Sequence, residues 1–157
     1  MGSVKRPTMV FVRQQLLPVA VAAAADAELI YRDSTEQQEI TNAAEVRLLG
    51  LKTSTLSRTS GNTNYPVLEK INFEAVYLLT YPMETSTPVA GSLSMNGAAQ
   101  AADDFADAVG SLNTNVPPYM IQADSVDITD NGVFADAPQL STITITVRGT
   151  AKCIGIP

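Results

Sequence analysis

Residues 141–148 read STITITVR and alternate between aliphatic side chains and hydroxyl-bearing or charged ones. A period of two places Ile143, Ile145 and Val147 on one face of an extended chain. Residues 71–80, INFEAVYLLT, follow the same pattern at first and are apolar on both faces in their second half. Both stretches predict strands of a sheet with one buried face. The doubly apolar half favours a helix on one side and a subunit contact or second layer on the other.

Two further stretches predict strands. Residues 45–55, EVRLLGLKTST, change face at Leu48-Leu49 beside Gly50, which is typical of a strand with a bulge. Residues 119–129 gain a period of two in their later part.

The segments next to these strands predict connections. Residues 56–65, LSRTSGNTNY, are rich in Ser, Thr, Asn and Gly, so we expect a long exposed hairpin loop. Residues 130–132, Asp-Asn-Gly, form a strong turn signal.

Two helices are expected. Residues 95–112 carry apolar side chains at spacings of three and four, while Asp103, Asp104 and Asp107 face away. Residues 18–30 are rich in alanine and begin with a proline, which suits a first helical turn. An extended conformation stays open for that second stretch, because a short apolar run does not separate a buried helix from a buried strand.

The expected order is an arm, a helix, two strands, a helix and two strands. It predicts an α+β fold in which an antiparallel sheet has two helices packed on one face. Residues 1–17, with Pro7 and several β-favouring valines, are predicted to form an extended N-terminal arm. Residues 18–157 are predicted to form a single domain, which suits a chain of 157 residues.

Composition excludes several classes of chemistry. The chain has no His, no Trp and one Cys, and its 10 Lys+Arg against 16 Asp+Glu give a net charge of −6. Without histidine there is no Ser-His-Asp or Cys-His nucleophile and no His-containing zinc site. The acidic balance argues against a basic surface that wraps nucleic acid. We therefore predict no enzyme, no catalytic or metal-binding residues and no cofactor.

The acidic residues leave one enzymatic alternative open. Asp103 and Asp107 stand one helical turn apart, as a carboxylate pair would, although a solvated helix face explains them equally. The run of Asp124, Asp127 and Asp130 lacks the alternate spacing of a calcium loop and is interpreted as a strand edge and turn. Cys153 is predicted to be an inert, partly buried thiol.

The element pattern resembles one known family. The strand pair EVRLLGLKTST and LEKINFEAVYLLTY, the helix AAQAADDFADAVGSLN and the closing pair PYMIQADSVDI and STITITVRG are similar to the tail-terminator and tail-completion (neck) proteins of tailed bacteriophages. The resemblance covers residues 18–150 in element order and length, and no diagnostic motif carries it. It implies a small α+β domain with an antiparallel sheet against two helices.

The resemblance also implies a function. A structural virion protein is expected, which forms a homo-oligomeric ring, with a hexamer expected, at the head–tail junction after assembly in the host cytoplasm. Its partners would be other neck, tail-tube or capsid proteins. DNA would pass without specific binding, along a lumen whose acidic side chains repel it. The alternatives are a capsid decoration (cement) protein or another tail structural protein, and, as a different class, a carboxylate-dependent hydrolase.

Four residues are candidates for subunit contacts: Arg13, Arg58, Tyr65 and Tyr77. No membrane partner is expected, because the apolar run at residues 16–25 falls short of the about 20 residues that span a bilayer.

Overall fold

The computed structural model describes residues 7–32, 44–55, 70–82, 95–133 and 140–153. Two helices and a six-stranded sheet form in the order α1 (Met9–Asp26), β1 (Ile30–Arg32), β2 (Glu45–Thr55), β3 (Lys70–Pro82), α2 (Met95–Gly110), β4 (Asn113–Val116), β5 (Tyr119–Val133) and β6 (Leu140–Cys153). The predicted α+β class, with helices against a mostly antiparallel sheet, is confirmed.

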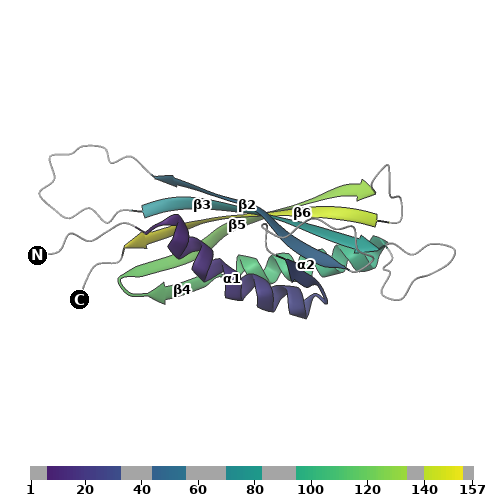
Figure 1. Ribbon diagram of the computed structural model, residues 1–157, viewed down its shortest axis with the longest axis horizontal. Coiled ribbons are helices and arrows are strands. Elements are labelled where there is room, and N and C mark those ends of the chain that lie inside the picture. The colour runs from purple at the N-terminus through teal and green to yellow at the C-terminus, as the bar shows by residue number, and fades with distance from the viewer. Residues whose placement is uncertain (1–6, 33–43, 56–69, 83–94, 134–139, 154–157) are drawn as a thin grey trace, which may run out of the picture.

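The sheet has the strand order β1-β2-β3-β6-β5-β4 and is strongly curled (Figure 1). β1 runs parallel to β2, and every other neighbouring pair is antiparallel. The predicted bulge in β2 is present as a register shift between Leu48 and Gly50. The hairpin loop predicted at residues 56–65 lies outside the described residues.

Both helices lie on one face of the sheet, where the core forms (Figure 1). The side chains of alternate β3 residues, from Ile71 to Tyr81, are buried against them. Tyr77 packs edge-on against Phe105 of α2, with ring centroids 5.3 Å apart. Phe11 of α1 stacks obliquely on Tyr119 of β5 at 5.0 Å. The alternate residues of β3 thus supply the inner face on which the helices pack in this two-layer fold.

The expectation of an extended arm is wrong for residues 9–17, which form the first half of α1. The Thr8 hydroxyl accepts a hydrogen bond from the Phe11 backbone N–H at 3.2 Å, which caps the helix at its start. Packing decides the rest, because the buried residues of α1 recur at helical spacing: Val12, Leu16, Ala20, Ala23 and Ala24. Tertiary burial outweighs the weak β preference of the valines and the cost of an internal Pro18. Residues 1–6 of the predicted arm lie outside the described residues.

The turn predicted at residues 130–132 is also wrong, since β5 continues to Val133. Asp130 still uses its side chain as a turn residue would, and its Oδ1 accepts the Gly132 N–H at 2.8 Å. Gly132 has a φ of 76°, and the register with β6 shifts between these two residues. The Asp-Asn-Gly signal therefore produces a bulge inside a long strand.

Two short strands escaped prediction. The helix ends at Asp26, so the last residues of the expected helical stretch turn instead into β1, which begins at Ile30. β4 forms a hairpin with the start of β5 across Pro117-Pro118.

Candidate functional site: subunit-contact surfaces

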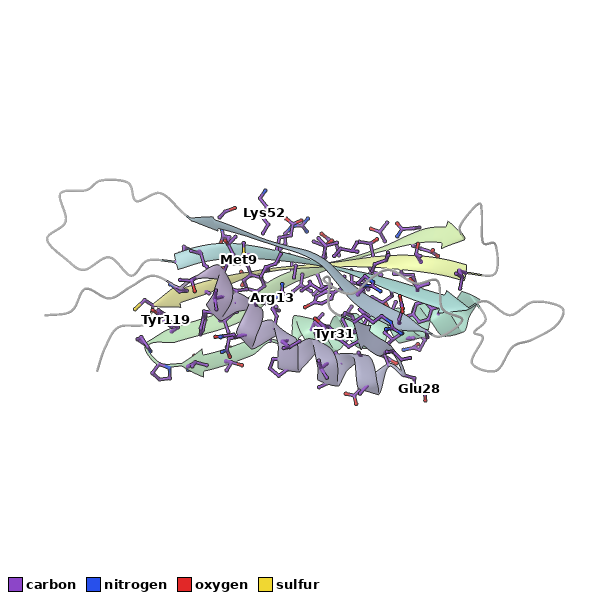
Figure 2. All side chains as sticks on the ribbon, in the orientation of Figure 1. Met9, Arg13, Glu28, Tyr31, Lys52 and Tyr119 are labelled. Carbon is purple, nitrogen blue, oxygen red and sulfur yellow. The ribbon has the colours of Figure 1, made fainter. Side chains whose placement is uncertain are left out.

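Helix α1 presents apolar side chains to solvent beside its buried face. Val10 is 63% exposed, Leu17 46% and Val21 44%, and Gln14 lies between them on the same side. We call these four residues the α1 stripe. Met9, also about half exposed, stands at the start of the helix (Figure 2).

Arg13 lies at the margin of this surface. Its side chain is exposed and borders a cavity of about 30 Å³ between α1 and the sheet, lined by Arg13, Leu16, Leu17, Tyr31, Leu48, Leu51 and Tyr77. Arg13 comes from α1 and Tyr31 from β1 (Figure 2). The predicted contact residue Arg13 is therefore accessible to a neighbour.

Tyr77 is a different case, and its prediction as a subunit contact is wrong. Its side chain is fully buried within the chain, because its β3 position faces the helices. Among the described residues its hydroxyl has no hydrogen-bond partner, and the same is true of Tyr81. Burial raises the pKa of both phenols above its ordinary value; Tyr31 adds to the rise at Tyr77 and Arg13 opposes it, while Asp104 adds to the rise at Tyr81.

The other two predicted contacts, Arg58 and Tyr65, lie outside the described residues.

The sheet face that points away from the helices is mostly polar, although Val76 and Leu78 of β3 lie on it. Rows of β6 threonines and charged residues cover it, and Lys52 projects from β2 on the side away from α1 (Figure 2). Arg148 lies between two carboxylates, with its Nε 3.7 Å from Glu74 and its Nη1 paired with Asp127. An open depression of about 220 Å³ lies here, lined by Lys52, Ser54, Asn72, Phe73, Glu74, Asp124, Arg148 and Gly149.

The acidic run of β5 takes part in the sheet. Asp124 accepts hydrogen bonds from Gln122 Nε2 at 2.9 Å and from Thr150 Oγ1 at 2.7 Å. With Asp127 on Arg148 and Asp130 on Gly132, all three carboxylates have partners within the chain. Their interpretation as a strand edge fits these contacts, whereas the turn does not.

A small ionic cluster joins β1 to β2. Glu45 is buried and accepts from Arg32 Nε at 2.6 Å, while Arg47 Nη2 lies 3.9 Å from its other oxygen. Removing one partner of such a buried pair leaves an uncompensated charge, so the cluster favours this strand pairing over others.

Charge is distributed unevenly between the two layers. The outward sheet face carries the lysines and arginines of the described strands: Arg32, Arg47, Lys52, Lys70, Arg148 and Lys152. The exposed side of α2 carries Asp103, Asp104 and Asp107. On this face the described strands carry more cations than carboxylates. The net charge of −6 conceals this segregation.

The structure does not bring the α2 aspartates into a cavity. They are exposed, and Asp104 accepts a hydrogen bond from Gln100 at 2.9 Å. Across the described residues, no group of three acidic or thiol side chains is arranged to hold a metal ion. Nor does any helix in the described part of the chain have the length and apolar character to cross a membrane. Cys153 is buried.

Comparison with protein-family models and with curated proteins found no match for this sequence.

Sequence reasoning missed the α1 stripe. The signal was present, because residues 9–25 contain one charged side chain and are apolar on both helix faces. It was missed because half of the segment was read as extended.

Proposed function

We propose that this protein is a structural virion protein of a tailed bacteriophage that forms a ring at the head–tail junction through contacts between copies. One observation carries the proposal. Both helices cover the same sheet face, and α2 lies in sequence between the β2–β3 pair and the β5–β6 pair. That is the arrangement that the resemblance to tail-terminator and tail-completion proteins implies.

The two edges of the sheet are suited to joining copies into a ring. β1 pairs with β2 only from Glu45 to Arg47, and β4 pairs with β5 only from Tyr119 to Gln122. Within the described strands, the rest of β2 and the rest of β5 have no neighbour on their outer sides. A contact that joins two different surfaces on neighbouring copies is heterologous. Such contacts close into a ring when the rotation from one copy to the next divides evenly into a full turn.

Strand direction favours the same contact. β2, β3, β6 and β5 alternate in direction across the sheet. The free side of β5 on one copy, placed beside β2 of the next, would therefore continue the antiparallel alternation. Each copy would supply main-chain hydrogen bonds to its neighbour, as in strand addition.

Negative-stain imaging of the purified protein tests the proposal. A closed ring with sixfold symmetry is expected for a tail-junction component, and twelvefold symmetry would point to a connector instead. The threonine-rich sheet face also suits a decoration (cement) protein, which would form threefold assemblies. Particles with no symmetry at any concentration would refute a ring.

A further inference from the structure

The α1 stripe is an apolar surface for which the described fold gives no use. Val10, Leu17 and Val21 are each exposed by 44% or more, although another side of the helix already supplies the core. Single exposed apolar residues are ordinary, but these three lie together on one helix face and form an apolar strip interrupted only by Gln14.

The spacing of the stripe suits packing against another protein surface. Positions 10, 14, 17 and 21 are separated by four, three and four residues, which is the spacing of the seam between packed helices. On one side of this seam the exposed residues are Pro18, Ala22 and Ala25, which are small enough to allow close approach.

The charges of α1 narrow the kinds of partner that fit the stripe. Between Met9 and Ala25 the only charged side chain is Arg13. A polyanion needs several cations, and a helix that lies on a membrane surface carries a Lys- and Arg-rich polar face, so neither partner fits. Copies of a chain with a net charge of −6 repel one another, and α1 is the helix on which that repulsion is smallest.

Area limits what the stripe does alone. A helix of 18 residues is about 27 Å long and about 10 Å across, so one side offers roughly 270 Å². A stable interface of standard size buries about 800 Å² on each partner. The stripe therefore fits one part of a larger contact, in which several weak surfaces act together.

We propose that the α1 stripe packs against a second copy of this chain within the assembled ring. The inference rests on the proposed function, because the stripe is too small to hold two copies together without other contacts. In this contact the stripe supplies the apolar part and the strand edges supply the polar part.

Charge substitution tests the stripe. Leu17→Glu and Val21→Glu each place a carboxylate in the contact, and Ala99→Glu places one on the exposed side of α2 as the matched control. Mass photometry over a concentration series measures the midpoint of assembly. Each stripe variant is expected to raise the midpoint at least about 10-fold, because half of a large apolar side chain loses its burial, while the control leaves it unchanged.

Two variants and a fold check keep the test decisive. Leu17 also borders the cavity beneath α1, whereas Val21 does not, so Val21→Glu reports on the stripe without that complication. Circular dichroism melts establish that each variant is folded. A ring that assembles equally well with both stripe variants overturns the inference and leaves the ring proposal standing.

Cross-linking tests whether the stripe contacts another copy even when no ring forms. A benzophenone attached to Leu17→Cys, with Ala99→Cys as control, reports contact with another copy, and the native Cys153 is buried from the reagent. Cross-links between copies from position 17 in the absence of any ring would uphold the stripe and count against the ring. A ring without such cross-links overturns the stripe alone, and a wild-type chain that never associates overturns both.

Discussion

Gly149 of β6 is the position where we expect a single added methyl group to lower the free energy of unfolding most. It pairs with Phe73 on one side and Ala123 on the other, beside the bulge between Ala123 and Ser125. A Cβ added there would stand 2.2 Å from the Gln122 carbonyl oxygen and 2.4 Å from Phe73 Cζ. The oxygen belongs to a paired strand, so Gly149→Ala forces a shift of backbone and not merely of a side chain.

Overpacking of this kind costs about 1–3 kcal/mol and sometimes more. Because the obstacle is backbone, we expect about 3 kcal/mol, which lowers the melting temperature by roughly 6–12 °C in a chain of this size. Thermal and urea unfolding followed by circular dichroism measure the change. Gly50→Ala in β2 is the control, since its added Cβ has nothing within 4 Å. Equal melting temperatures for the two variants would refute the close approach at Gly149.

Other predictions concern single groups. Thr8→Ala removes the N-terminal cap of α1 and should cost about 1 kcal/mol in urea unfolding. Tyr81→Phe removes a buried hydroxyl that has no partner in the described part of the chain, so the free energy of unfolding should rise by about 1 kcal/mol; a decrease would reveal a missed partner. Burial raises the pKa of Tyr77 and Tyr81 in the folded chain, while the unfolded phenols ionise near 10.0. The unfolded state then binds fewer protons above that pH, so stability should fall as pH rises further, and less steeply in the Tyr81→Phe variant. Arg148→Met breaks a half-exposed pair and should cost less than about 1 kcal/mol, as measured by thermal melts in low salt.

The long strands β2, β3, β5 and β6 and the helix α2 were predictable because their patterns follow directly from burial on one side. β3 and β6 alternate in the sequence and in the structure, and Leu48-Leu49 beside Gly50 marks the bulge. The acidic residues of α2 lie on its exposed side as expected. In each case a local period matches a face of the fold, so no knowledge of distant contacts was needed.

The errors came from residues whose role depends on distant partners. α1 is apolar on both sides, so its sequence has no clear amphipathic period, and the helix beyond its Thr8 cap depends on packing against the sheet. The Asp-Asn-Gly signal became a bulge because β6 continues to pair beyond it. Tyr77 was assigned to a contact because the second half of β3 is apolar on both faces, and only the placement of α2 shows which face is buried.

The mass of the purified protein in solution tests the central claim most directly. If copies join through heterologous contacts into a ring, mass photometry should show one closed species, at about 100 kDa for six copies of the 16.6 kDa chain. The fraction of the protein in this species should rise with concentration. Few intermediates should accumulate, because a closed ring satisfies every contact. A monomer at every concentration, or an open series of masses without a closed species, would contradict the account.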